Sequence, residues 1–281
     1  MIRHRFEYRV PRAIEEAIEI LAAAGDDCAV LGGGTWLIPN MTFATHQPKI
    51  VLDPRHLDLA TITQSDAEVH VGARVTYHAA LNSPLVRTQL PLLAKMSEQI
   101  TGGISIVGQG TIGGSACYAN PSSDVPACLL ALRARLQLRS IAGTREIDAA
   151  EFYRGAFATA RRADEILTGI VFPKMSATAT SGYQKLKFSM GSWPIVTAAV
   201  VAEADTAGRL FRVSLGAASA TPILTEQRLA TDPAVSEFEA FSRSCAHIDA
   251  EWSDELAGPG YRRNVAPSVV LKALLQCGAA R

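Results

Sequence analysis

The segment at residues 108–126, GQGTIGGSACYANPSSDVP, constrains the fold of this chain more than any other feature. Four glycines fall within seven residues, and the hydroxyl residues Thr111 and Ser115 lie among them. Glycine adopts a positive φ without steric cost and lets another group approach the backbone closely. Consecutive main-chain N–H groups in such a loop can point into one concave anion site. The segment therefore predicts a loop that binds phosphate oxygens.

A second glycine cluster, Gly32-Gly33-Gly34-Thr35, directly follows the apolar run Cys28-Ala29-Val30-Leu31. Two glycine loops that each carry a hydroxyl group suit a ligand with two phosphates. We therefore expect both loops to form one diphosphate site. Glycine pairs are also common at turns between strands that bind no ligand, so the pattern alone leaves that alternative open.

The spacing Gly108-x-Gly110-x-x-Gly113 matches the dinucleotide fingerprint, but its surroundings do not. That fingerprint requires a strand before the glycines, a long helix after them and an acidic residue about 20 positions on. Pro121 interrupts any helix soon after the glycines, and residues 130–140 contain no carboxylate. A Rossmann fold is therefore excluded.

Charge and cysteine content exclude several classes of protein. The 281 residues include 27 Lys plus Arg and 27 Asp plus Glu, so no net charge attracts nucleic acid or a membrane surface. No apolar run has the form of a signal peptide or the length of a membrane span. The five cysteines are widely spaced and form no C-x-x-C pair, which argues against a disulfide framework, zinc or an iron–sulfur cluster. We expect a cytoplasmic protein.

Periodicity predicts an α+β chain with several lobes. Residues 1–57 are β-α-β-like, with a helix at 11–24 and strands at 28–31 and 49–53. Residues 58–173 are predicted to hold hairpins at 59–64 with 68–74 and 135–141 with 144–147, helices at 76–81, 90–100 and 124–132, and a strand at 165–172. Residues 174–181 are a predicted linker, and residues 182–281 hold strands at 182–188, 195–204 and 209–218 and helices at 233–247 and 265–276. Strands and helices in blocks indicate the α+β class.

Five motifs occur in a fixed order: FEYRVPRAIEEAIEILA, VLGGGTWLIPNM, GTIGGSACYANPSSDVPACLLAL, EILTGIVFP and YQKLKFSMGSWPIVTAAV. In this order and spacing the chain closely resembles the FAD-binding medium subunit of the xanthine dehydrogenase and carbon monoxide dehydrogenase family of molybdenum hydroxylases. The resemblance covers nearly the whole chain, and TIGG followed by S-D-x-P-A is its most specific part.

The resemblance implies a two-lobed FAD-binding domain of the PCMH or vanillyl-alcohol-oxidase type, with lobes at 1–57 and 58–173. A small α+β domain with a three-stranded antiparallel sheet and helices follows at 182–281. The chain would carry FAD, while partner subunits carry molybdopterin and [2Fe–2S] clusters in a dimer of heterotrimers. Electrons would pass from the clusters through FAD to NAD or another acceptor.

The resemblance also assigns binding residues, with no catalytic residue and no metal ligand in this chain. The first wall of the diphosphate site would be Ala29, Val30, Leu31, Gly32, Gly33, Gly34, Thr35 and Trp36, and the second Thr111, Gly113, Gly114 and Ser115. Asp124, Thr101 and Leu167 would line the FAD site, Lys185 would lie near the flavin ring, and Trp193 would pack against it. Without the resemblance, Asp124 is a helix N-terminal acid, Lys185 a solvated lysine and Trp193 a core aromatic.

Two departures from the family pattern keep other functions open. Trp36 replaces a small polar or acidic residue, and Val107-Gly108-Gln109 replaces an arginine and asparagine, which removes a positive charge. A stand-alone flavin oxidase or reductase is one alternative, although its covalent-flavin types have a histidine where this chain has Thr35 or Trp36. A scaffold that has lost its flavin is the other.

Overall fold

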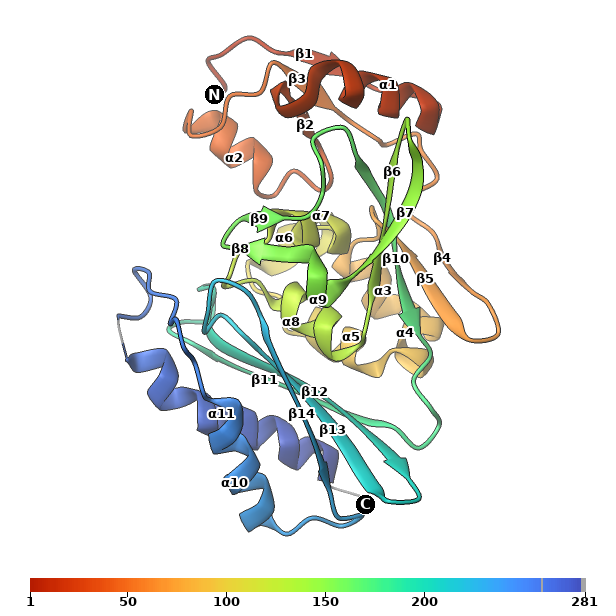
Figure 1. Cartoon of the computed structure of the whole chain (residues 1–281). Helices are drawn as coiled ribbons and strands as arrows, with labels where there is room; N and C mark the ends of the chain where they lie inside the picture. Colours follow the sequence, from red (N-terminus) through yellow and green to blue (C-terminus); the bar gives the residue numbers. More distant parts are fainter. Residues whose placement is uncertain (259, 279–281) are drawn as a thin grey trace.

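The computed structural model describes residues 1–258 and 260–278, which form three parts stacked along the long axis of the molecule (Figure 1). The first part contains β1 (Glu7–Arg9), α1 (Ile14–Ala24), the 3₁₀ turn Gly25–Asp27, β2 (Cys28–Val30), α2 (Leu37–Thr42) and β3 (Ile50–Leu52). Its strands run parallel in the order β1-β3-β2, which confirms the β-α-β prediction. Parallel strands are joined by a crossover connection, usually a helix that covers the sheet. Helix α1 is that helix here, and its apolar face, with Ala17, Ile18 and Leu21, is buried.

The middle part is an antiparallel sheet with helices on one side. Its strands, in the order β4-β5-β10-β6-β7, are β4 (Ile62–Gln64), β5 (Glu68–Gly72), β10 (Ile166–Pro173), β6 (Arg135–Ser140) and β7 (Gly143–Asp148). Its helices are α3 (Tyr77–Asn82), α4 (Pro84–Gln89), α5 (Pro91–Glu98), α6 (Gly103–Gln109), α7 (Ile112–Tyr118), α8 (Asp124–Ala131) and α9 (Ala149–Phe152), followed by the small hairpin β8 (Tyr153–Gly155) and β9 (Ala158–Thr159). Both predicted hairpins are present.

The glycine-rich stretch is not the continuous loop that the sequence predicted. It contains the end of α6, the whole of α7 and the start of α8. The Thr111 hydroxyl caps α7 by accepting a hydrogen bond from the Gly114 N–H at 3.0 Å. Glycine is required here for close packing: a Cβ on Gly113 would lie 2.5 Å from the Ala73 carbonyl oxygen. Tight packing therefore outweighs the low helix propensity of glycine.

The third part is a four-stranded antiparallel sheet, and the prediction of three strands was wrong. Its elements are β11 (Thr180–Lys187), β12 (Pro194–Asp205), β13 (Gly208–Gly216), β14 (Ile223–Leu229), α10 (Val235–Cys245) and α11 (Tyr261–Gly278). The missed strand, β14, lies at the edge of the sheet and is polar and largely exposed, so it lacks the apolar alternation of a buried strand. Strand β11 begins at Thr180, inside the segment expected as a linker.

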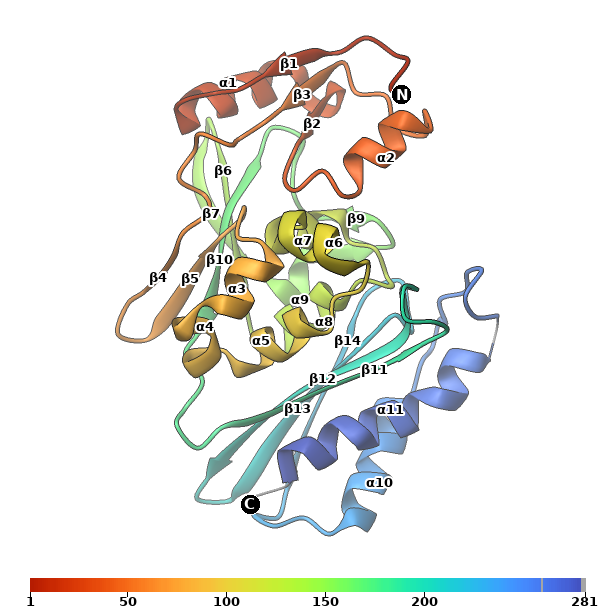
Figure 2. The same ribbon diagram turned by 180° about the vertical axis from the view of Figure 1, so that it is seen from behind.

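This sheet is buried on both faces. Side chains alternate across a strand, so Ala198 and Val200 of β12 pack toward α10 and α11, whereas Ala199 and Val201 join the core of the middle part. Figures 1 and 2 show α10 and α11 on the outer face and the middle part on the other. The third part is therefore fixed against α5 and α8, next to the glycine-rich stretch that contains α7.

We predict that Gly182→Ala destabilises the protein. A Cβ there would lie 2.0 Å from the Ala273 carbonyl oxygen of α11, and overpacking of this kind costs about 1–3 kcal/mol. Urea unfolding measures the loss. The control is Gly191→Ala, where no atom lies within 4 Å of the added Cβ, so it should change stability by less than about 0.5 kcal/mol. Equal stability of the two variants would contradict the packing of β11 against α11.

Candidate functional site

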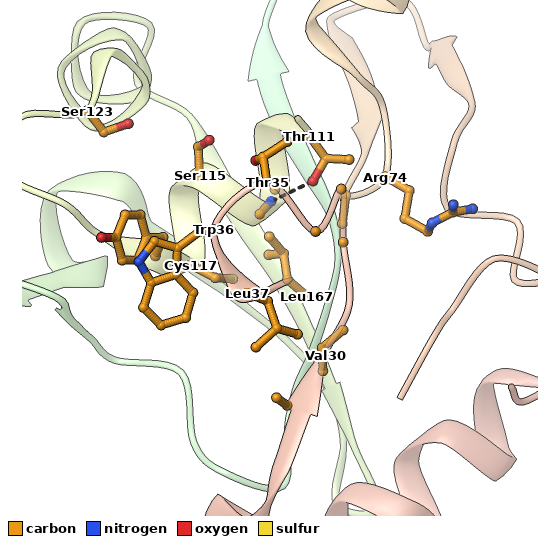
Figure 3. Close-up of a pocket in the computed structure, with 18 of the residues that line it drawn as sticks. Val30, Thr35, Trp36, Leu37, Arg74, Thr111, Ser115, Cys117, Ser123 and Leu167 are labelled. Atoms are coloured by element: carbon orange, nitrogen blue, oxygen red, sulfur yellow. Dashed lines mark hydrogen bonds between the residues drawn. The ribbon is translucent and has the colours of Figure 1, made fainter. Parts of the chain in front are cut away.

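A cavity of about 950 Å³, here called the interlobe cavity, lies between the first and middle parts (Figure 3). It reaches the third part at Gly191 and Trp193. Its volume is in the range of ligand-binding pockets. Fifteen of the seventeen residues predicted from the sequence line it: Ala29, Val30, Gly32, Gly33, Gly34, Thr35, Trp36, Thr101, Thr111, Gly113, Gly114, Ser115, Asp124, Leu167 and Trp193. Leu31 and Lys185 do not.

The two glycine segments, 32–35 and 108–115, meet at the wall of the interlobe cavity. A Cβ on Gly33 would lie 1.9 Å from the Gln109 carbonyl oxygen, and one on Gly32 would lie 3.0 Å from Thr111 Oγ1. Gly34 has φ of +72°, which only glycine adopts readily. A larger side chain at residue 33 would therefore prevent this contact, so the approach of the two segments requires glycine in the first segment.

Successive main-chain N–H groups of the first segment have no protein acceptor. The flanking Leu31 and Ile38 N–H groups donate to the carbonyls of Leu52 and Gly34, at 2.8 and 3.0 Å. Within the described part of the chain, no acceptor is found for the N–H groups of residues 32–36. Partly buried N–H groups need a partner, and a row of them suits an anion.

Asp124 begins α8, is buried and faces the interlobe cavity. Its Oδ1 accepts hydrogen bonds from the Tyr183 hydroxyl and from Lys185 Nζ, the latter at 3.0 Å. The side chains of Lys185 and Asp124 are each 3% exposed. Burial raises the pKa of the Asp124 carboxyl, and the Lys185 ammonium partly offsets this effect. Lys185 therefore contacts Asp124 behind the cavity wall and does not line the cavity itself.

Other fixed charges at the cavity favour an anion. The Glu165 carboxylate is neutralised by Arg145 at 2.6 and 2.9 Å. Arg74 and Arg161 line the cavity, and neither makes an ion pair with a carboxylate of the described residues. Among the lining acids, the Asp26 carboxylate forms no salt bridge with any residue that the structure describes. The two unpaired guanidinium groups outnumber this single carboxylate.

Aromatic residues without a sequence motif also line the interlobe cavity. The Trp36 ring lies 4.5 Å from the Tyr118 ring, centroid to centroid, and Tyr118 lies 5.2 Å from Phe157. The Tyr77 hydroxyl hydrogen-bonds with Ser115 Oγ. Sequence reasoning identified Trp36 but missed Tyr77, Tyr118 and Phe157, because single aromatics at irregular spacing carry no signal. Trp36 thus packs across the two lobes.

The cysteines and the possible metal ligands of the described residues form no reactive or metal-binding site. Burial raises the pKa of the Cys117 thiol at the cavity wall to about 11, so the thiol stays protonated at neutral pH. All five cysteines are free. Across residues 1–258 and 260–278, no group of three or more His, Cys, Asp or Glu could hold a metal ion, and no helix has the length and apolarity to span a membrane.

We predict that Lys185→Met destabilises the protein by about 3–5 kcal/mol at neutral pH, because it leaves the Asp124 carboxylate buried without its cation. The carboxyl would then take up a proton more readily in the folded than in the unfolded state. The loss should therefore shrink as the pH falls toward about 3.9, the carboxyl's unfolded-state pKa, and should shrink no further below it.

Urea unfolding at two pH values measures this effect. Lys187→Met is the control, since the Lys187 ammonium is exposed and donates only to the Met190 carbonyl. A loss below about 1 kcal/mol for Lys185→Met, or an equal loss in both variants, would contradict a buried ion pair.

Comparison with known proteins agrees with this geometry. Residues 4–175 match the family described as the FAD binding domain in molybdopterin dehydrogenase. The chain is 32% identical over 281 residues to the carbon monoxide dehydrogenase medium chain of Afipia carboxidovorans, covering 94% of this chain and 97% of that one. It is 28% identical to the nicotine 6-hydroxylase medium subunit of Paenarthrobacter nicotinovorans, covering 97% of each.

Among solved structures, reconstituted CO dehydrogenase from Oligotropha carboxidovorans superposes with a TM-score of 0.89 and 28% identity over 100% of both chains. The family match covers more than half of the chain, and the relatives match over nearly their whole length. Both comparisons indicate the same family. The chain therefore belongs to the FAD-binding medium subunits of the molybdenum hydroxylases, the family of the molybdopterin dehydrogenases.

Proposed function

We propose that this subunit carries electrons from the [2Fe–2S] clusters of a partner, through FAD in the interlobe cavity, to NAD or another acceptor. The row of unpartnered N–H groups at residues 32–36, where the two glycine segments meet, is the observation that supports it most. A diphosphate supplies oxygen acceptors for such groups.

The cavity residues fit FAD. We propose that the predicted residues of the first and second walls hold the diphosphate, and that Asp124, Thr101, Leu167 and Trp193 lie toward the flavin. FAD supplies the ability to take up and release electrons, which no side chain here provides. The protein's part is to hold and orient the cofactor, and Trp193, 47% exposed, leaves that end of the cavity open to an electron donor or acceptor.

The partners we propose are a molybdopterin-binding large subunit and a [2Fe–2S] small subunit, assembled as a dimer of heterotrimers in the cytoplasm. The names of the relatives support partner subunits, because they are medium chains or subunits of larger enzymes. Exposed apolar side chains also occur in the loop that carries Gly191 and Trp193: Phe188 is 79% and Met190 is 89% exposed. Such side chains suit a protein interface.

We predict that the purified chain is yellow and releases about one FAD per chain on denaturation. Gly33→Ala should weaken FAD binding at least about tenfold, because the added Cβ forces the two glycine segments apart. Gly108→Ala should bind FAD as the wild type does, since no atom lies within 4 Å of that Cβ. Flavin fluorescence titration measures both, with urea unfolding to verify that each variant is folded.

Colourless protein that cannot be reconstituted would contradict the proposal and favour a scaffold that has lost its flavin. Substrate turnover by the isolated chain would favour the stand-alone oxidase. Under anaerobic conditions we expect the bound flavin to bleach only when the partner subunits and their substrate are added. The acceptor is then identified by testing NAD and an artificial quinone separately.

A further inference from the structure

A second groove, of about 670 Å³, shares the 32–35 segment with the interlobe cavity. Its other walls come from α2, from the chain after β3 and from α6. Arg74 lines both cavities, and in Figure 3 it lies on the other side of the glycine segment from Trp36 and Cys117. The proposed function assigns no role to this groove.

Arg74 lines the groove and forms no ion pair within the described part of the chain. Its NH1 group donates to the Arg55 carbonyl at 3.2 Å, and its Nε atom is buried without a hydrogen-bond partner among residues 1–258 and 260–278. No carboxylate of the described residues pairs with it. The buried Nε is closed to a ligand, but Arg74 lines the groove and its charge is not offset, so the rest of the guanidinium is suited to bind an anion.

Among the described residues that line the groove, Asp53 is the one carboxylate, and it does not offset the positive charge of Arg74. Asp53 Oδ2 accepts from Arg55 at 2.5 and 2.8 Å and from the Tyr8 hydroxyl at 2.6 Å. Asp53 and Arg55 thus neutralise each other, and the Arg74 charge remains. The groove therefore carries a net positive charge, although the whole chain carries none.

We propose that this groove binds the phosphate group of a small molecule, separately from FAD, with Arg74 as the principal ligand. A guanidinium fork matches phosphate oxygens in a bidentate arrangement. The volume exceeds that of a phosphate ion, and Ile38 and Pro39 form an apolar wall that suits the organic part of a nucleotide. The ligand's charge would lie across the glycine segment from the FAD diphosphate, so each ligand should weaken the other's binding a few-fold.

Calorimetric titration of the FAD-saturated full chain with ADP, pyrophosphate and adenosine tests the proposal. We expect ADP and pyrophosphate to bind and adenosine not to bind. Tighter binding of ADP identifies a nucleotide as the ligand, whereas equal affinities identify the free phosphate anion. The flavin absorbance, read in the same samples, reports whether FAD stays bound.

Arg74→Gln should weaken ADP binding at least tenfold. Arg154→Gln removes the same charge from an exposed position outside both cavities and should leave ADP binding unchanged. Gln109 lines the groove and its side chain is exposed. Gln109→Glu therefore adds a negative charge to the groove and should weaken ADP binding several-fold.

Three results would overturn the proposal. They are no binding of ADP or pyrophosphate to the FAD-saturated chain, release of FAD in proportion to the ADP bound, and equal affinities in the Arg74→Gln and Arg154→Gln variants. Failure of the chain to bind FAD at all would instead count against the proposed function.

Discussion

The approach of the two glycine segments is the constraint on which the rest of the structure depends. A Cβ on Gly33 would overlap the Gln109 carbonyl oxygen, so the first part of the molecule can contact α6 and α7 only through glycine. That contact shapes the wall of the interlobe cavity and leaves a row of main-chain donors unpaired. Fold and site therefore arise from one packing requirement.

The third part of the molecule is tied to the same cavity through a buried polar network. Asp124 faces the cavity, and its partners Tyr183 and Lys185 come from β11. Burial alone disfavours the charged carboxylate, and the Lys185 ammonium makes the pair neutral as a unit. The C-terminal sheet thus helps to set the electrostatic environment of the cavity, although of its elements only the loop between β11 and β12 reaches the lining.

Much of this arrangement could be predicted from the sequence, and the exceptions have physical reasons. Periodicity located α1, both hairpins and β12, whose apolar patterns are strong. The helices α6 and α7 were missed because glycine has a low helix propensity, so the sequence predicts a loop unless the tertiary packing is known. Strand β14 was missed because an exposed edge strand carries polar residues. Arg74 and Tyr118 belong to no motif, and only the fold brings them to a cavity. The roles of the lining residues as FAD ligands stay predictions.

A crystal structure of the chain with FAD bound tests the central claim most directly. The account predicts that the oxygens of the diphosphate lie within hydrogen-bond distance of the N–H groups of residues 32–36 and next to the start of α7. A nucleotide seated elsewhere, with the two glycine segments in contact but empty of ligand, would contradict it.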